Sequence, residues 1–193
     1  MPKVVDHEAY REELLRASFE IVAKVGYGTL SMKQLAQSMN ISVGLIYHYF
    51  KNKEDWFVSL VVHFSKETFD RIRKGIPRES GRLEKIRLLA LEMERNRDLY
   101  ASMIRVTTDF SRMQQQGNSP GMFQIGMALS YLYEQIALRL EIDERQARAL
   151  VSYLAGAILA ARLDPRGFDT GECIHFMHKL LDVPESAPTG EPA

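Results

Sequence analysis

Apolar side chains recur three and four positions apart through most of the chain, which is the spacing of one face of an α-helix. The spacing is clearest just after residue 30, where one stripe consists of Met32, Leu35, Ala36 and Met39. Ser31 stands three residues before Gln34, a capping-box spacing that begins a helix. Asn40 can end this helix, because asparagine tolerates the left-handed backbone conformation needed there. The pattern predicts a helix of about two turns.

A second short helix is predicted directly after the turn. Ser42 is a candidate N-cap, and Ile46 and Phe50 would face the core while Ile41 packs in the turn. The residues left largely off the core are Val43, Gly44, Leu45, Tyr47 and His48. Two helices of about seven residues joined by a short turn form a helix-turn-helix, whose second helix enters the major groove of DNA.

The rest of the chain shows the same spacing, so we expect an all-α protein of about nine helices. The remaining predicted helices span residues 7–25, 53–74, 82–96, 98–113, 122–140, 144–163 and 169–182. Stretches with Gly and Pro at 75–81 and 114–121 interrupt the pattern. We expect a three-helix DNA-binding domain at 1–50, a larger helical domain at 51–183, and a disordered, proline-containing tail at 184–193.

Charge is unevenly distributed along a chain that is neutral as a whole. The 25 Lys and Arg residues balance the 25 Asp and Glu residues, yet residues 21–53 contain no acid. Lys24, Lys33, Lys51 and Lys53 give that segment a charge of +4. DNA binding depends on local cations and phosphate-facing donors, so this segment suits a DNA-binding surface whatever the overall charge.

Composition indicates a globular protein: 46% of the residues are apolar and 26% are charged. No apolar run approaches the roughly 20 residues that cross a bilayer, and the N-terminus lacks a hydrophobic signal region, so a cytoplasmic location is expected. Cys173, the single cysteine, fits a reducing compartment. It forms a C-x-H-x-x-H string with His175 and His178, but positions 173 and 175 point about 200° apart on a helix. We expect no metal site and no cofactor.

The helix-turn-helix segment resembles the N-terminal signature of the TetR/AcrR family of bacterial transcriptional regulators. The resemblance runs from about Tyr10 to Phe57 and is carried by G-Y-x-x-L-S-M-K-Q-L-A-x-x-x-x-I-S-V-G-L-I-Y-H-Y-F-K-N-K-E-D-W. It implies an effector-binding and dimerisation domain after residue 50. It also implies a repressor that binds a palindromic operator in double-stranded DNA as a homodimer. The resemblance does not identify an effector, but we expect a small, largely apolar one to release the operator.

The resemblance assigns roles to residues of the predicted DNA-binding surface. The positions that match phosphate-holding positions of the family are Ser31, Ser42, Tyr47, Tyr49 and Lys53. Val43, Gly44 and Leu45 fall where the family reads base edges, and the apolar side chains of Val43 and Leu45 suggest contacts with thymine methyls. Lys33 and His48 complete the predicted set. Plain N-caps are the alternative for the two serines, and Tyr49 and His48 could simply pack.

A pocket between the middle helices is a further prediction, because methionine adapts to varied ligands. The candidate lining residues are Met93, Tyr100, Met103, Arg105, Met127, Tyr131 and Glu134. Core packing explains each of them equally well. Arg105 stands four residues before Asp109, where an exposed ion pair is the favoured interpretation.

Three of the later helices carry more apolar surface than one neighbour covers. Segment 122–140 has a second apolar side at Phe123, Met127 and Tyr131 and is expected to be buried on two faces. The last two helices are expected to form a four-helix dimer interface about a two-fold axis. The predicted interface residues are Leu150, Leu154, Gly156, Ala157, Ile158, Ala161, Ile174, Met177 and Leu181.

Other functional classes find less support in the sequence. An all-helical enzyme is disfavoured because there is no Gly-rich phosphate loop, no G-x-S-x-G and no evident carboxylate–histidine cluster. A purely architectural DNA-binding protein would not need the large apolar second domain. A regulator without a small-molecule effector stays open as the alternative.

Overall fold

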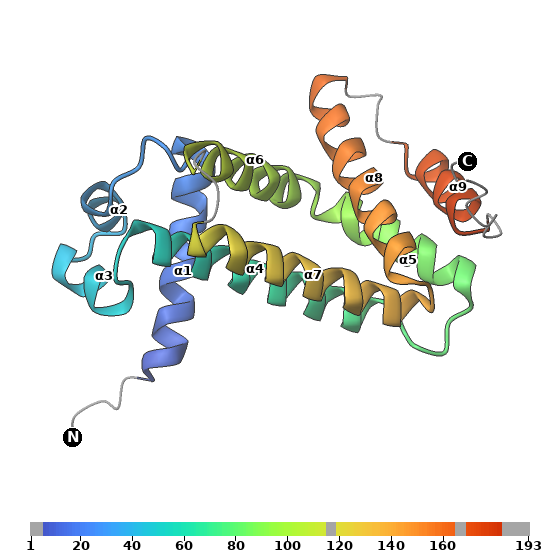
Figure 1. Ribbon diagram of the computed structural model, residues 1–193, viewed down its shortest axis with the longest axis horizontal. Coiled ribbons are helices and arrows are strands. Elements are labelled where there is room, and N and C mark those ends of the chain that lie inside the picture. Colours follow the sequence, from blue (N-terminus) through green and yellow to red (C-terminus); the bar gives the residue numbers. More distant parts are fainter. Residues whose placement is uncertain (1–5, 115–118, 165–168, 183–193) are drawn as a thin grey trace, which may run out of the picture.

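The computed structural model describes residues 6–114, 119–164 and 169–182, and within these ranges the chain forms nine α-helices and no strand (Figure 1). The helices are α1 His7–Val25, α2 Met32–Ser38, α3 Val43–Tyr49, α4 Lys53–Gly75, α5 Arg82–Arg95, α6 Arg97–Met113, α7 Pro120–Leu140, α8 Glu144–Leu163 and α9 Thr170–Asp182. The all-α prediction is confirmed, and each predicted helix range agrees to within two residues at both ends. The tail predicted at 184–193 lies outside the described residues.

Capping side chains set several of the helix starts. The capping box predicted at Ser31 is formed, and Asp143 forms a second one, each with a glutamine at the third helical position. Asn52 begins α4 by accepting a 2.8 Å hydrogen bond from the Asp55 amide. Asn40 has a φ of 55°, the left-handed conformation expected for it after α2. Local chemistry therefore accounts for the short helices and for the turn between them.

The start of α7 differs from the prediction by two residues, because Pro120 occupies the first turn and Ser119 caps the helix. Residues 115–118, half of the loop predicted at 114–121, lie outside the described residues. The Gly121 amide donates a 2.9 Å hydrogen bond to Glu54 Oε1. A Cβ atom at Gly121 would lie 2.4 Å from that oxygen and 2.9 Å from Val58. Glycine is therefore required where α7 meets the first turn of α4.

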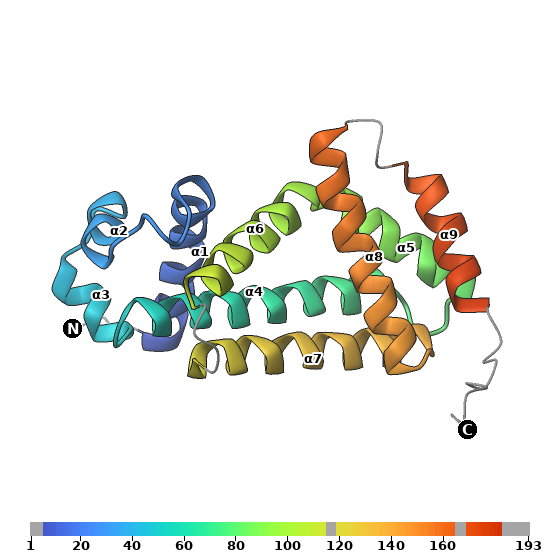
Figure 2. The ribbon, with the colours of Figure 1, turned by 45° about the horizontal axis from the view of Figure 1, so that its top comes forward.

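The arrangement is an elongated bundle built on α4 and α7, which run side by side in the same direction (Figure 2). Helices α1, α2 and α3 lie at the N-terminal end of this pair, and α5, α8 and α9 lie at its other end. Glu54 joins α7 at the first end, and the Arg139 guanidinium donates to the Arg73 carbonyl at the second. Helices α4 and α7 therefore connect the two ends of the molecule.

The core does not divide at residue 50. One cluster of buried side chains joins α1, α2, α3 and the first half of α4 to Val106 and Phe110 of α6 and Ile125 of α7. At its centre the ring centroids of Tyr27, Phe57 and Phe110 lie 4.7 to 4.9 Å from one another. A second cluster joins the far ends of α4 and α7 to α5, α8 and α9. The boundary predicted at residue 50 stays a prediction, and packing continues across it.

Some predicted apolar faces point to solvent. Val25, the last residue of α1, is 50% exposed. The second apolar side of α7 is also open, with Phe123 72%, Met127 58% and Tyr131 48% exposed. The expectation that α7 is buried on two faces is wrong for the single chain, because α4 covers only one of them.

Candidate nucleic-acid interface and central cavity

Helix α3 has one buried side that fixes its position and one side that is exposed to solvent. Its inward residues Ile46 and Phe50 are both 1% exposed. Gly44, Tyr47 and His48 are exposed on the opposite side. Val43 and Leu45, predicted to read bases, are half-buried, and Val43 packs against the core. A rigid short helix with polar groups and open backbone on its outer side fits a groove reader.

Both serine predictions are satisfied locally as helix caps. Ser31 Oγ accepts from the Gln34 amide at 3.2 Å, and Ser42 Oγ accepts from the Leu45 amide at 3.1 Å. Each serine is exposed, as is Lys33 on α2. A hydroxyl oxygen that accepts a backbone hydrogen bond keeps its own proton to donate, so capping leaves phosphate contact available to Ser42. Ser31 Oγ already donates to Gln34 Oε1 at 2.8 Å, so it would have to exchange that bond for one to a phosphate.

Tyr49 and His48 lie close to the start of α1. The Tyr49 hydroxyl lies 3.1 Å from His7 Nδ1, and its ring lies 5.5 Å from the Tyr10 ring. The His48 ring lies 5.1 Å from that of Tyr49 and 6.0 Å from that of His7. Tyr49 is half-buried in this group while His48 is exposed. The packing interpretation therefore describes Tyr49, and its role toward DNA stays a prediction.

Lys53 does not extend into solvent as a phosphate-binding side chain would. Its ammonium lies 4.2 Å from the centroid of the Tyr27 ring and 3.5 Å from the Gly28 carbonyl oxygen. Burial lowers the pKa of this ammonium, and the Asp109 carboxylate opposes the shift. Lys51, two residues earlier, is exposed. A spacing pattern places Lys53 at the start of α4 but does not reveal the aromatic ring that attracts it.

Asp109 ties α6 to the loop that leads into α2. Its Oδ2 accepts a 2.8 Å hydrogen bond from the Gly28 amide, and Oδ1 accepts from Arg112 at 3.0 Å. The backbone hydrogen bond is the main cause that lowers the pKa of this carboxyl group. The ion pair with Arg105 is therefore wrong, since Arg112 pairs with Asp109 in its place. The sequence gives only a weak signal for the contact between Asp109 and Gly28. Asp109 is an acid near the end of an amphipathic helix, and the G-x-G loop that contains Gly28 lies far from it in the sequence.

Replacing Asp109 with alanine is expected to lower the free energy of unfolding by about 1–3 kcal/mol, because the Gly28 amide loses a charged acceptor. The loop before Ser31 should loosen, and operator affinity should fall with it. Urea denaturation measures the first effect, and amide hydrogen exchange at residues 26–31 measures the second. Ser111→Ala, an exposed change on the same helix, is the control. Unchanged exchange in the loop would contradict this role for Asp109.

A cavity of about 350 Å³ lies between the middle helices. It is walled by α4, α5, α6, α7 and α8, and nearly all of its lining is aliphatic, aromatic or hydroxyl-bearing. The lining residues are Val61, Phe64, Ser65, Thr68, Ile72, Leu89, Met93, Tyr100, Met103, Ile104, Thr107, Thr108, Ile125, Leu129, Leu132, Tyr133, Ile136, Val151, Ser152, Leu154, Ala155 and Ile158. Its size is at the lower end of the range of ligand pockets.

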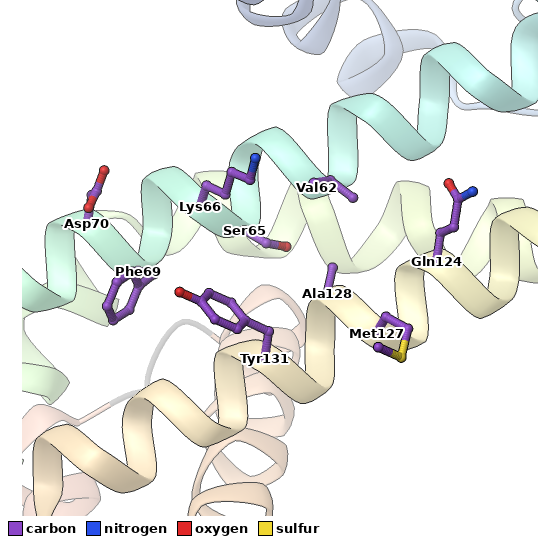
Figure 3. A pocket seen from close by; sticks show the side chains of 9 residues that line it. All are labelled: Val62, Ser65, Lys66, Phe69, Asp70, Gln124, Met127, Ala128 and Tyr131. Carbon is purple, nitrogen blue, oxygen red and sulfur yellow. The ribbon is translucent and has the colours of Figure 1, made fainter.

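The predicted pocket residues separate into three groups. Met93, Tyr100 and Met103 line the cavity. Met127 and Tyr131 instead line a groove on the outside of α4 and α7, where Figure 3 shows both side chains projecting from α7. Arg105 borders a surface hollow beside the loop at residues 26–29, and Glu134 is exposed on α7. The last four assignments to the cavity are wrong, because helical spacing alone does not distinguish the inner side of α7 from its outer side.

The predicted dimer residues are also divided by burial. Leu150, Leu154, Ile158, Met177 and Leu181 are at most 3% exposed within the single chain. They pack in the chain's own core and offer no surface to a second copy, so their assignment to an interface is wrong. Gly156 is exposed, and Ala157, Ala161 and Ile174 are half-buried. The large exposed residues of these helices are Leu159, Leu163 and Phe176.

Among the residues described, no group of three or more His, Cys, Asp or Glu side chains is placed to hold a metal ion. Cys173 is buried, and its sulfur lies 3.6 Å from the Tyr153 hydroxyl. None of the described helices is both long enough and apolar enough to cross a membrane.

A serine-capped reading helix on a three-helix bundle, joined to a helical domain with an internal cavity, defines a helix-turn-helix DNA-binding regulator. A family model described as "Bacterial regulatory proteins, tetR family" matches residues 14–60. Residues 14–60 therefore form a DNA-binding segment of the tetR type, and the comparisons together support a TetR-family transcriptional regulator.

Full-length relatives and solved structures agree with this assignment. The transcriptional regulator PksA of Bacillus subtilis is 26% identical over 86% of this chain and 84% of its own length. BetI of Pseudomonas fluorescens is 24% identical over 95% of this chain and 96% of its own. FadR of Bacillus subtilis, solved with stearoyl-CoA, has a TM-score of 0.64 and 19% identity, covering 90% of this chain and 98% of FadR. The multidrug-binding protein EbrR, solved with malachite green, has a TM-score of 0.68 and 19% identity with the same coverage.

Proposed function

We propose that this regulator is a homodimeric, cytoplasmic repressor that reads a palindromic operator with α3 and releases it when a small effector occupies the central cavity. The observation that carries the proposal is the shared wall of the two sites. Helices α4 and α6 line the cavity, and the same helices hold Phe57 and Phe110 against Tyr27 beneath the helix-turn-helix. A ligand that moves α4 or α6 therefore also moves the helix-turn-helix.

The DNA half of the proposal rests on the outer face of α3 and on nearby donors. Tyr47 is 50% exposed on that face, and Ser31, Ser42, Lys33 and Lys51 are exposed on neighbouring segments. Hydroxyl and ammonium donors of this kind hold phosphates and fix the register on the duplex. Gly44 and the exposed edges of Val43 and Leu45 face the bases in this proposal. Lys53 joins them only if its ammonium leaves Tyr27.

The effector half rests on contacts that join the helices around the cavity to the helix-turn-helix region and to each other. From α6, Asp109 holds the Gly28 amide. From α4, Glu54 holds the Gly121 amide and so fixes the start of α7. The effector must bind the DNA-incompetent state more tightly, since only a difference in affinity shifts the equilibrium. FadR and EbrR, which share the fold, were solved with stearoyl-CoA and malachite green, and this supports a ligand role for the cavity.

The test of DNA binding uses single changes on α3. An operator is first selected from fragments of the source genome, and its affinity is measured by fluorescence anisotropy beside random DNA. Tyr47→Phe should weaken both complexes by a similar factor, because a phosphate contact carries little sequence information. Leu45→Ala should change the preferred sequence, by about 1–3 kcal/mol for each disturbed base contact.

Tyr131→Phe is the matched control, because Tyr131 is 48% exposed but lies on α7 away from α3. It should leave both affinities unchanged. If Tyr47→Phe and Leu45→Ala also bind like the wild type, α3 is not the reading helix. Full operator binding that no ligand alters would favour the alternative, a regulator without a small-molecule effector.

A further inference from the structure

Among the described residues, those that line the cavity include no acidic or basic side chain. Its polar groups are hydroxyls, contributed by serine, threonine and tyrosine. An ionised ligand group inside such a wall would lose its hydration without gaining a counterion, which is strongly unfavourable. We propose that the cavity takes an uncharged, largely apolar molecule with a neutral hydrogen-bonding group; the assignment rests on the proposed role of the cavity as the effector site.

Two charged side chains that contact lining residues are paired with each other. Arg71 Nε lies 3.2 Å from Glu92 Oε1, and Arg71 also donates to Thr68 Oγ1 at 3.0 Å. The same Glu92 oxygen accepts from the Tyr100 hydroxyl at 3.2 Å and from Asn96 at 2.9 Å. Burial and Glu92 raise the pKa of Tyr100 to about 12, so the hydroxyl keeps its proton. Neither charge of the Arg71–Glu92 pair is left over for a ligand.

Arg148, which lies near the lining residue Tyr133, is paired as well. Arg148 lies 5.2 Å from the centroid of the Tyr133 ring, but its guanidinium is paired with Glu144 at 2.7 Å. The hydroxyls of Thr107, Tyr133 and Ser152 belong to three different helices and line the wall. A hydroxyl both donates and accepts, so these groups suit an alcohol, a carbonyl or an ether oxygen.

A pair of fluorescent probes with one skeleton tests the ligand class. N-phenyl-1-naphthylamine is uncharged, and 8-anilinonaphthalene-1-sulfonate is the same molecule with an added sulfonate. Titrated into the full-length protein, the neutral probe should bind at least about tenfold more tightly, a difference of roughly 1.4 kcal/mol. Competition between the two probes shows whether they share a site.

Variants locate the binding and reverse the preference. Met103→Lys places an ammonium in the wall on a side chain of similar length, and it should turn the preference toward the sulfonate. Met103→Leu keeps the wall apolar and should keep the preference of the wild type. Met127→Lys puts the same charge in the outer groove on α7 and should change neither affinity. Circular dichroism checks that each variant remains helical.

The outcomes distinguish the ligand class from the regulatory function. The proposal is overturned if the sulfonate probe binds as tightly as the neutral probe and neither Met103 variant changes this binding. It is also overturned if neither probe binds. If the neutral probe binds at Met103 with the expected preference but leaves operator affinity unchanged, the ligand class stands. In that case the effector part of the proposed function fails.

Discussion

Replacing Phe110 with alanine is expected to lower the free energy of unfolding by about 3–5 kcal/mol. The ring is fully buried, stacked on Phe57 at 4.8 Å and set edge-on to Tyr27 at 4.9 Å. Its removal leaves a cavity at the point where α6 supports the reading domain. Urea denaturation monitored by the fluorescence of Trp56, the only tryptophan, measures the loss.

Trp56 fluorescence reports on the packing of α4 against α1, because Trp56 is buried and its indole donates a 3.0 Å hydrogen bond to Ser18 of α1. The reading domain and α6 should therefore unfold together. Phe123→Ala on α7 is the matched control, since that ring is 72% exposed and its loss should change stability by less than about 0.5 kcal/mol. If Phe110→Ala left the Trp56 transition in place while the overall helical signal was lost earlier, the two domains would not share a core.

Local sequence signals predicted the elements of the fold closely. Capping side chains such as Ser31 and Asp143 act on backbone amides three residues away, so their effect is readable without tertiary structure. Asn40 is a similar case, because its left-handed backbone follows from the short turn it occupies. The open face of α3 could also be predicted, since Ile46 and Phe50 leave only one side to face inward.

The candidate sites could be predicted less well, because periodicity shows that a helix face is apolar but not what covers it. Leu154 and Leu181 were placed at a dimer interface, yet α5, α8 and α9 bury them within one chain. Met127 and Tyr131 lie on α7 with cavity residues such as Ile125, but on its outer side. Lys53 and Asp109 depend on partners 26 and 81 residues away, at Tyr27 and Gly28, and no local pattern records such contacts.

The exposed face of α8 leads to the prediction with the largest effect on DNA binding. Gly156, Leu159, Ala160 and Leu163 recur at helical spacing and are all exposed, and Phe176 of α9 is exposed nearby on the second helix of the proposed interface. Leu163 is 91% exposed. We expect this face to pair with itself about a two-fold axis, with small residues allowing close approach of the helices. Such a dimer would set two copies of α3 about 34–36 Å apart, one turn of DNA, or at a multiple of that distance.

Gly156→Glu is expected to produce a monomer that binds the operator about 100-fold more weakly or worse, because the second half-site no longer gains from the first. A side chain at Gly156 meets no atom of its own chain within 4 Å, and glutamate favours helix over glycine, so the monomer should remain folded. Gly126→Glu on α7 is the matched control, since that glycine is also exposed with nothing within 4 Å. Sedimentation velocity and operator titration on both variants give the result. A Gly156→Glu protein that sediments as a dimer and binds like the wild type would remove α8 from the interface, and the exposed row on α7 would become the surface to test.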